Sequence, residues 1–531
     1  MPALPGLRLL AAGLMLGAAS AGMATGKAGP GDAWWAIVTT LADDRLEGRM
    51  TGSTGYDAAA RIVVREFRRI GLKPAGTDGF LQPVDLVEQR VDTSASRAGF
   101  AGAGASQPLA IPQDIYFRGS HPMPETVDAP MVFAGYGLSL PEAGHDDFAG
   151  LDVRGKLVVV IAGGPPDLPG AAKASARSER AALLARQGAV GIVAVSTARQ
   201  TEIPWARQVS LASRPSMYLA EPTLREVDRP FLSATFSPER AADLFAGEEH
   251  GFAELAALAD AGSPLPRFAL RRRLTARIAT ISRPVRSANL VARLPGSDPV
   301  LSRQHIVLSA HLDGLGINEP IAGDAIYNGA LDNAAGVANV IAIARDLVRH
   351  GKRPRRSILF LVPTAEEQGL LGSRYFVKRP TVPLRSIVAN INFDMPLPIF
   401  PLRTITPIGF EESTLGDDAA AVSADSGLPI VPDPFPDRNV FIRSDQYSFV
   451  RAGIPALFPK FGFAAGTPEA ATERAWRANI YHSPSDDTRQ PVLRDEMVGM
   501  NRWTARLLRR IGNAPGAPRW HPASRFARTA E

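Results

Sequence analysis

The sequence predicts an α/β fold with a mostly parallel central sheet flanked by helices and a smaller α/β domain inserted into it. From residue 289 onward, short and nearly continuous apolar runs alternate with helical stretches, which is typical of parallel strands covered on both faces. A separate group of strands with one helix lies earlier, between about residues 131 and 196. The chain has 531 residues, of which 45% are apolar. This is enough for a large core in roughly two to four domains.

Periodicity assigns the individual elements. Apolar residues at helical spacing from Tyr56 to Ile70 predict a helix that ends at Gly71. The earlier α/β unit has the strands MVFAGYG, KLVVVIAGG and AVGIVAVS, with the helix ARSERAALLARQG before the last of them. A helix over 252–261 and a strand-like alternation over 274–281 follow. The later strands are HIVLSA, SILFLVPT, IVANINF and IPALF, and a long helix runs from Ala334 to about His350.

The first residues predict a secretory signal peptide over 1–27. Arg8 precedes an apolar stretch that begins at Leu9 and leads into small residues near Ala19, which is too short for a stable membrane span. The alternative is a buried N-terminal helix of the fold. No later segment reaches the roughly 18 apolar residues that a membrane span needs. We therefore expect a mature protein without a membrane span, secreted or in a bacterial periplasm.

The amino-acid composition excludes some kinds of active site and bears on the choice of partner. The chain has no cysteine, which excludes disulfides, thiolate metal ligands and a cysteine nucleophile. Any bound metal must therefore use histidine and carboxylate ligands. The net charge is +6, with basic clusters at 271–273 and 352–356, so nucleic-acid binding has to be considered. Because these clusters lack interleaved aromatic residues, we expect no nucleic-acid partner.

Metal-competent side chains follow three of the apolar runs. HIVLSA leads into His311, SILFLVPT leads into Glu366 and Glu367, and IVANINF leads into Asp394. Taken singly, each has an ordinary explanation, as a strand-end histidine, a solvated pair of acids or a turn former. In an open parallel sheet, however, ligands bind beyond the carboxyl ends of the strands. The shared position of these side chains predicts a site at that edge.

Asp332 and His482 complete the candidate set. Asp332 lies in YNGALDNAAG near the start of the long helix, where an acid also serves as a helix cap. His482 lies in IYHSPSDD, on a loop after the IPALF strand, where a histidine is usually only a surface residue. No other histidine of the chain lies just beyond one of these apolar runs, and we assign the others no role.

The charges of this set favour two divalent metals. Asp332, Glu367 and Asp394 carry one negative charge each, and a bridging hydroxide adds another, which together offset two divalent cations. One bridging carboxylate, with one histidine and one further carboxylate for each metal, suits a pair of zinc ions.

Two neighbouring acids are expected to assist. Asp313, two residues after His311, is predicted to accept the ring N–H of that histidine and to fix its tautomer. Glu366 is left over beside a metal ligand, which is where a general base for the bridging water belongs.

These motifs resemble the zinc aminopeptidases of the bacterial leucyl aminopeptidase and glutamate carboxypeptidase type, in the subgroup with an inserted protease-associated (PA) domain. The segment 41–74 is similar to the N-terminal part of that family, and 132–196 is similar to its insert. The resemblance implies a zinc-exopeptidase fold of the phosphorylase/hydrolase-like kind. The resembling site segments are SAHLDGLG, AIYNGALDNAAGVA, PTAEEQGLLGS, INFD, RSDQYSF and YHSPSDD.

The resemblance also implies how the ligands divide. His311 and Asp394 would bind one zinc ion, Glu367 and His482 would bind the other, and Asp332 would bridge them. The resemblance also implies Glu366 as the general base and Asp313 as the partner of His311, in agreement with the roles inferred above.

Two positions depart from the family pattern. Gln446 stands where many relatives have a histidine, and Phe441 stands where some have a tyrosine that donates to the oxyanion. We expect Tyr481 or the segment 444–447 to supply a substitute donor.

The sequence therefore predicts a secreted metallo-exopeptidase, a di-zinc aminopeptidase for peptides with a free N-terminus. One alternative is a carboxypeptidase for acidic C-termini, which would need pocket arginines such as Arg443. Others are a single-zinc glutaminyl-cyclase-like enzyme and an inactive receptor-like binding protein. The expected domains after the signal peptide are a discontinuous catalytic domain over 30–125 and 276–515, a PA-like insert over 126–275 that shades the site, and a tail over 516–531.

Overall fold

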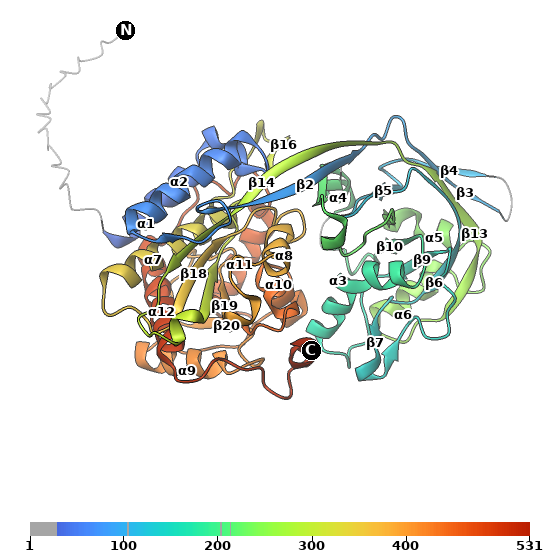
Figure 1. The fold of residues 1–531 in the computed structure, drawn as a ribbon. Helices are drawn as coiled ribbons and strands as arrows, with labels where there is room; N and C mark the ends of the chain where they lie inside the picture. Colours follow the sequence, from blue (N-terminus) through green and yellow to red (C-terminus); the bar gives the residue numbers. More distant parts are fainter. Residues whose placement is uncertain (1–28, 103–105, 202–203, 213, 531) are drawn as a thin grey trace, which may run out of the picture.

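The computed structural model describes residues 29–530, apart from 103–105, 202–203 and 213. The predicted signal peptide falls outside the described residues. Within them, no helix combines the length and the apolar character that crossing a membrane would require. Two large sheets organise the molecule, and each has its own hydrophobic core (Figure 1).

The first sheet has nine strands in the order β11–β2–β14–β18–β15–β19–β21–β20, with β1 beside β14. Strands β18, β15, β19 and β21 pair in parallel at its centre, and the flanking pairs are antiparallel. The predicted α/β class is confirmed, with parallel pairing confined to the four central strands. The bounds are β1 Lys73–Pro74, β2 Leu81–Val91, β11 Ser216–Leu219, β14 Thr280–Leu294, β15 His305–Ser309, β18 Ser357–Val362, β19 Ile387–Asn392, β20 Ile405–Ile408 and β21 Ala456–Phe461.

Helices cover both faces of this sheet, as its uninterrupted apolar strands require. Ile306 and Leu308 of β15 pack in the core under α1, α2, α7 and α12, whereas Val307 between them packs with Phe376 of α8 and Phe449 of α10 on the other face. The bounds of these helices are α1 Pro30–Leu41, α2 Thr54–Ile70, α7 Ala335–Arg349, α8 Leu371–Lys378, α10 Gln446–Arg451 and α12 Arg494–Asn513. Two further helices around this sheet and its loops are α9 Leu415–Ser426 and α11 Pro468–Asn479, whereas α4 Trp205–Ala212 packs beside β5 of the second sheet.

The ends of two of these helices follow the sequence signals. The Ser53 side chain accepts a hydrogen bond from the Tyr56 amide and begins α2, and Gly71, at φ 89°, ends that helix in the left-handed conformation. Helix α7 begins directly after the irregular turn 330–334, in which Asp332 and Asn333 have non-helical backbone angles.

The second sheet has eight strands in the order β4–β3–β13–β6–β9–β10–β12–β5. Helix α3 packs on one face, and α5 and α6 pack on the other. The bounds are β3 Arg97–Ala101, β4 Gln107–Leu109, β5 Ile115–Phe117, β6 Thr126–Ala134, β9 Leu157–Ile161, β10 Gly191–Val195, β12 Leu232–Phe236, β13 Arg267–Arg277, α3 Gly170–Arg186, α5 Ala241–Leu244 and α6 Phe252–Asp260. Two short hairpins complete the strands, β7 Ser139–Leu140 with β8 His145–Asp146 and β16 Gly316–Ile321 with β17 Asp324–Tyr327.

The second sheet does not coincide with the expected insert over 126–275. Strands β3, β4 and β5 belong to the second sheet although they lie at residues 97–117, before the expected insert. Strand β11, at 216–219, lies within the expected insert but pairs in the first sheet. These short strands lack the long apolar runs that mark β6, β9 and β10, so the sequence pattern did not reveal their partners. The domain boundaries and the identity of the insert as a PA domain therefore stay predictions.

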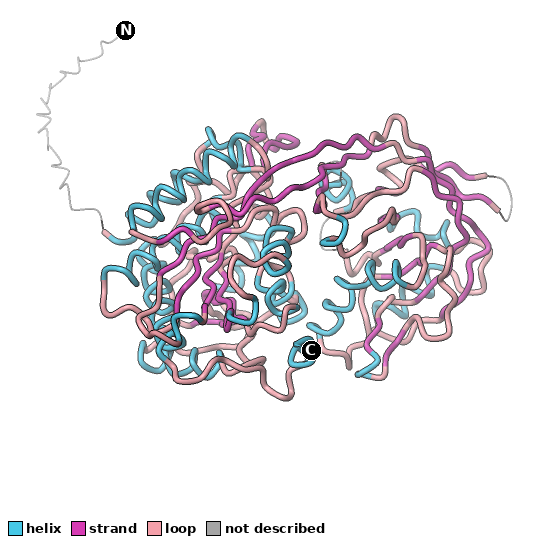
Figure 2. The backbone as a smooth tube through the Cα atoms, in the orientation of Figure 1, coloured by secondary structure: helices cyan, strands magenta, loops and turns pink. Residues whose placement is uncertain are grey.

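The molecule has two halves, each built around one of the two large sheets. Long strands and polar contacts join them. The antiparallel pair of β2 and β14 extends from the first sheet toward the second (Figures 1 and 2). Below it, the Tyr447 hydroxyl of α10 lies 2.8 Å from Ser175 Oγ and donates to Glu179 Oε1 at 3.0 Å, both on α3. Arg374 of α8 pairs with Glu226 at 3.0 Å. The second half thus packs directly against the helices beside the central strands.

The C-terminal tail packs on the first half. Trp520 pairs with Ser413 in a β-bridge and donates its indole N–H to the Gly453 carbonyl. The Phe526 ring lies 5.4 Å from that of Phe441. The described part of the segment 516–531 therefore closes one of the smaller cores.

Arg49 is a fully buried cation that joins the N-terminal segment to two loops of the first sheet. Its guanidinium donates to the carbonyls of Leu41 and Asn328 at 2.6 Å, Leu312 at 2.9 Å and Gly329 at 3.0 Å. Burial lowers the pKa of Arg49 to about 10, although the carboxylate of Asp486 opposes this shift. The side chain is therefore charged at neutral pH and saturated with carbonyl acceptors.

Replacing Arg49 with methionine is expected to destabilise the fold by about 3–5 kcal/mol, because four carbonyl oxygens inside the protein lose their donor at once. The matched control is Arg45→Met in the same segment. Arg45 makes an exposed ion pair with Asp43, so its loss should leave the unfolding midpoint nearly unchanged. Urea unfolding of both variants measures the difference; equal midpoints would contradict the anchoring role of Arg49.

Candidate metal centre

The carboxyl ends of the central parallel strands carry the candidate residues. His311 lies two residues beyond β15, Asp394 two residues beyond β19, and Glu366 and Glu367 in the loop after β18. Because parallel strands end at a common edge, these loops meet although they are distant in the sequence. Asp332 reaches the same place from the turn before α7, and His482 reaches it from the loop after α11.

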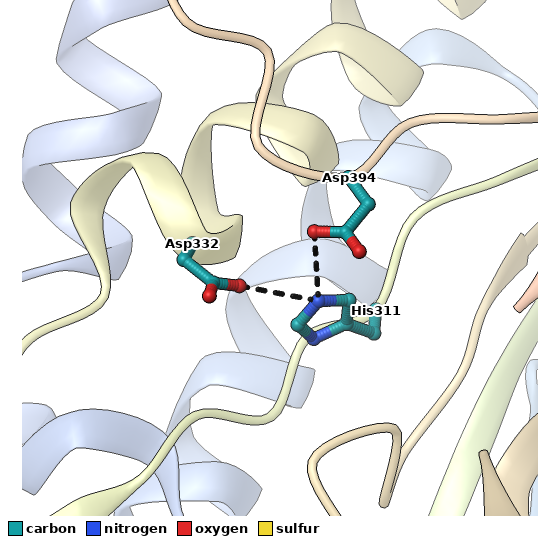
Figure 3. A group of neighbouring side chains, drawn as sticks. All are labelled: His311, Asp332 and Asp394. Carbon is teal, nitrogen blue, oxygen red and sulfur yellow. Dashed lines mark ion pairs between the residues drawn. The ribbon is translucent and has the colours of Figure 1, made fainter. Parts of the chain in front are cut away.

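His311, Asp332 and Asp394 form the first group of ligand-type atoms (Figure 3). The Nε2 atom of His311 lies 3.4 Å from Asp332 Oδ1 and 3.6 Å from Asp394 Oδ1. All three side chains are buried. Neither His311 Nε2 nor Asp394 Oδ1 has a hydrogen-bond partner among the described residues.

Asp332, Glu367 and His482 form the second group. The Nε2 atom of His482 lies 3.3 Å from Asp332 Oδ2 and 3.5 Å from Glu367 Oε2. The side chain of His482 is 26% exposed, compared with 1% for His311, so the second group lies nearer to solvent. Asp332 belongs to both groups and directs a different oxygen to each.

The spacing of these atoms fits a pair of tetrahedral cation sites. Zinc binds histidine nitrogen and carboxylate oxygen at about 2.0–2.2 Å, which places neighbouring ligand atoms of a tetrahedron about 3.3–3.6 Å apart. The four nitrogen–oxygen distances in the two groups run from 3.3 to 3.6 Å. The buried atoms His311 Nε2 and Asp394 Oδ1, which have no hydrogen-bond partner among the described residues, also indicate a cation site. The donor set therefore fits two zinc ions that share Asp332.

Asp313 supports His311 in a different way from the one predicted. The ring atom Nδ1 lies 3.1 Å from the backbone carbonyl of Asp313 but 3.8 Å from its carboxylate, which is too far for a hydrogen bond. The carboxylate accepts instead from the amides of Glu366 and Glu367 and from the Thr51 hydroxyl. Asp313 thus fixes the tautomer through its carbonyl, which leaves Nε2 free to bind a metal, and shapes the loop that carries both glutamates.

Asp486 holds the backbone at Asp332. Its carboxylate accepts from the amides of Leu331 and Asp332 at 2.9 Å, and its carbonyl accepts from Ala330. Asn333, which follows a cis peptide bond, donates to the carbonyl of Phe393 next to Asp394. These bonds fix the shared carboxylate relative to the neighbouring strand end.

Glu366 lies beside the first group without being one of its members. Its Oε2 atom is 4.0 Å from His311 Nε2. Burial raises the pKa of Glu366 well above its ordinary value; His311 opposes this shift, and the carboxylates of Asp394 and Glu367 add to it. In this environment the Glu366 carboxylate has a higher proton affinity than one in water.

A cavity of about 380 Å³ opens on this edge of the sheet. Its lining includes the acids Asp332, Glu366, Glu367 and Asp394, together with His482. The other lining residues are Gly369, Leu370, Arg374, Met395, Arg438, Val440, Ile442, Arg443, Ser444, Arg477 and Tyr481. The candidate metal ligands are therefore accessible from a space large enough for a peptide end.

The two departures from the family pattern lie away from this cavity. Gln446 is fully buried, where its amide donates to the carbonyls of Val440 and Phe441 and its carbonyl accepts from Asn392. Phe441 packs against Phe526. Of the suggested substitutes, Tyr481 and Ser444 line the cavity.

Residues of the second half complete the rim. Arg207 of α4 donates to the Tyr481 carbonyl at 3.2 Å, and Ser120 donates to the Gln368 carbonyl at 2.9 Å, next to Glu367. The guanidinium of Arg214 lies 4.9 Å from the centre of the Tyr327 ring. These contacts place parts of the second half directly over the loops that carry the site.

Sequence reasoning missed Arg49 and Asp486. Both occur in segments that resemble the family, LEGRMTGS and YHSPSDD, but neither follows an apolar strand. The available signal was that each is a charged residue in a segment that resembles the family but is not one of the predicted ligands. Such a residue is a candidate for positioning the ligands.

Comparison with known proteins relates this site to a family. Residues 289–506 match the model of peptidase family M28. Leupeptin-inactivating enzyme 1 from Streptomyces exfoliatus is 30% identical over 213 residues, which cover 37% of this chain and 42% of that protein. The probable leucine aminopeptidase 2 from Aspergillus oryzae is 30% identical over 182 residues, covering 32% of each chain. The chain thus matches less than half the length of these two relatives.

Among solved structures, the aminopeptidase from Aneurinibacillus sp. strain AM-1 superimposes with a TM-score of 0.53 at 18% identity. The similarity covers 92% of this chain and 95% of that one, so it extends over both sheets and shows a common fold. Both groups of ligand-type residues lie within 289–506. Through this region, the chain is similar to peptidase family M28.

Proposed function

We propose that the chain is a di-zinc aminopeptidase that hydrolyses the first peptide bond of peptides with a free N-terminus. The observation that carries the proposal is that two histidine–carboxylate groups share the two oxygens of Asp332 at the floor of an open cavity. The match to a peptidase family and the name of the relative from Aspergillus oryzae support the reaction class.

His311 and Asp394 would hold one zinc ion, His482 and Glu367 would hold the other, and Asp332 would contribute one oxygen to each. Zinc ions bound there would polarise the scissile carbonyl group, lower the pKa of a water molecule and orient the substrate amine. The protein contributes rigid placement, since Asp486 and the carbonyl of Asp313 fix the ligands from behind.

Glu366 acts as the general base in this proposal. It lines the cavity and lies beside the first ligand group, but neither group of ligand atoms needs it. Its carboxylate accepts a proton from the attacking water and then passes this proton to the departing amine. The raised pKa of its carboxyl group makes the carboxylate a stronger base, which favours the first of these transfers.

Tyr481 is positioned to assist at the carbonyl oxygen. Its ring stacks on His482 with 3.8 Å between the ring centres, and it lines the cavity. Burial raises the pKa of Tyr481 well above its ordinary value, so the hydroxyl keeps its proton and stays a donor. In the proposal, Tyr481 replaces the tyrosine that some relatives have where Phe441 stands here, and donates to the developing oxyanion.

The alternatives fit the site less well. A carboxypeptidase for acidic C-termini needs uncommitted arginines. Of the four arginines that line the cavity, Arg374 pairs with Glu226, and Arg438 and Arg477 both pair with Glu473, which leaves Arg443 as the single candidate. A single-zinc glutaminyl-cyclase-like site would need only one of the two histidine groups. A receptor-like protein without catalytic function would not need a base beside a complete ligand set.

The second half of the molecule is proposed to restrict access to the site. Its segments at Ser120 and Arg207 contact the loops around Glu367 and His482, so it forms one wall of the approach. This agrees with a PA-like insert that shades the site. The N-terminal pattern over 1–27 alone supports the further proposal that the chain is exported to the periplasm or the medium.

Metal analysis of the purified chain tests the ligand assignment. Wild type should bind two zinc ions per chain, and His482→Ala or Asp394→Ala should each bind one, because each variant removes a ligand from a single group. His350→Ala, which changes an exposed histidine outside the site, is the matched control and should still bind two. Native mass spectrometry after removal of free metal reports the count. A wild-type ratio of one zinc would rule out the paired site.

Glu366→Gln tests the base. The variant should keep both zinc ions while kcat for leucine p-nitroanilide falls roughly 10²- to 10⁴-fold, the contribution of a placed proton acceptor. The exposed Glu411→Gln provides the control and should match wild type. If Glu366→Gln retained full turnover with its metal bound, another group would have to take the proton.

A blocked substrate separates an aminopeptidase from an endopeptidase. Leucine p-nitroanilide should be hydrolysed, whereas N-acetyl-leucine p-nitroanilide should lose at least about 10²-fold in kcat/KM, since the free amine helps to orient the bond. Chelation should abolish both rates, and added zinc should restore them. Equal rates on the two substrates would contradict the exopeptidase assignment.

A further inference from the structure

A second, smaller cavity of about 40 Å³ adjoins the one over the metal ligands. Arg438, Val440 and Arg477 line both spaces. Most other walls of the small cavity are apolar, and they include Leu397, Ile408 and the rings of Phe400, Phe435, Phe461 and Phe463. The small cavity is therefore a largely apolar recess that shares a wall with the cavity over the metal ligands.

Two polar atoms at this cavity have no partner. Lys460 of β21 and Thr406 of β20 are directly paired across the antiparallel strands, and both line the recess. Lys460 Nζ and Thr406 Oγ1 are buried and make no hydrogen bond within the described part of the chain. A buried ammonium without an acceptor costs several kcal/mol, so such a group is rarely found without a function.

The acids near Lys460 are already engaged. Glu473 accepts from both Arg438 and Arg477, and the Asp433 carboxylate accepts from the Phe435 amide at 2.9 Å. The ammonium lies over the Phe458 ring, whose centre is 4.8 Å away. Burial and the nearby Arg477 together lower the pKa of Lys460 to about 8, so the group is still mostly protonated at neutral pH.

We propose that this recess receives the side chain of the substrate's N-terminal residue and selects an acidic one, whose carboxylate accepts hydrogen bonds from Lys460 Nζ and Thr406 Oγ1. The inference rests on the proposed aminopeptidase function and adds its substrate class, peptides that begin with glutamate or aspartate. The aromatic walls contact the methylene groups, and the two donors at the β20–β21 pair satisfy the terminal oxygens. A neutral side chain would leave the ammonium unpaired.

The test compares glutamyl, glutaminyl and leucyl p-nitroanilides on the zinc-loaded enzyme. Glutamate and glutamine differ in charge but hardly in shape, so wild type should prefer glutamate by roughly 10- to 100-fold in kcat/KM, as expected for a hydrogen bond between charged groups. Lys460→Met should remove this preference, and Thr406→Val should reduce it by a smaller factor. The exposed Lys352→Met is the matched control and should keep the wild-type ratio.

Calorimetric titration with free L-glutamate and L-leucine supplies a readout that does not depend on turnover. Tighter binding of glutamate to wild type, lost in Lys460→Met, supports the recess. If Lys460→Met fails to fold, the wild-type glutamate-to-glutamine ratio and Thr406→Val still decide the question.

Three results would overturn the assignment in distinguishable ways. If leucyl but not glutamyl p-nitroanilide is hydrolysed, the recess does not select acids, although the proposed function stands. If N-acetyl-alanyl-glutamate is hydrolysed in a manner that requires Lys460, the recess binds a C-terminal carboxylate instead. If no aminoacyl p-nitroanilide is hydrolysed and L-glutamate does not bind, the proposed function and the inference fail together.

Discussion

The placement of one carboxylate, that of Asp332, governs the arrangement of the site. Its two oxygens face two histidines, His311 and His482, that come from loops 171 residues apart in the sequence. A rotation of this side chain, or a shift of its backbone, would change the distances between ligand atoms in both groups at once. The surrounding structure therefore fixes it from several directions, with Asp486 on the amides before it and Arg49 on the carbonyls of Asn328 and Gly329.

Electrostatics explain why so rigid a frame is needed. Six acids gather within this edge of the sheet, namely Asp313, Asp332, Glu366, Glu367, Asp394 and Asp445. Burial raises the pKa of Asp445 to about 7 and that of Glu367 to about 7, which reflects the cost of holding negative charge away from water. Arg49 supplies one buried positive charge from behind. Two divalent cations would offset four more of these charges, so metal binding and the stability of this edge should depend on each other.

The convergence of the candidate ligands was predictable because it follows from one rule, that polar residues after buried parallel strands meet at one edge. His311, Glu367 and Asp394 obey that rule directly. The use of the Asp313 carbonyl in place of its carboxylate was not predictable, since it depends on which acceptor the loop amides of Glu366 and Glu367 engage first. The strands at 97–117 were missed because they are short and pair with β13 or β12, far along the chain.

Specificity can be separated from catalysis in this architecture. The candidate ligands and Glu366 come from loops beyond β15, β18 and β19 or from the segments at Asp332 and His482. Lys460 and Thr406 instead come from the antiparallel pair formed by β21, the outermost of the parallel strands, and the edge strand β20. A substitution at the edge pair changes the recess without moving the ligand loops, because the central strands are held by their own packing on both faces. The wall formed by the second half contacts the loops of Glu367 and His482 instead. The size of the accepted substrate and the identity of its N-terminal residue would thus be determined by two different parts of the chain around the same candidate metal centre.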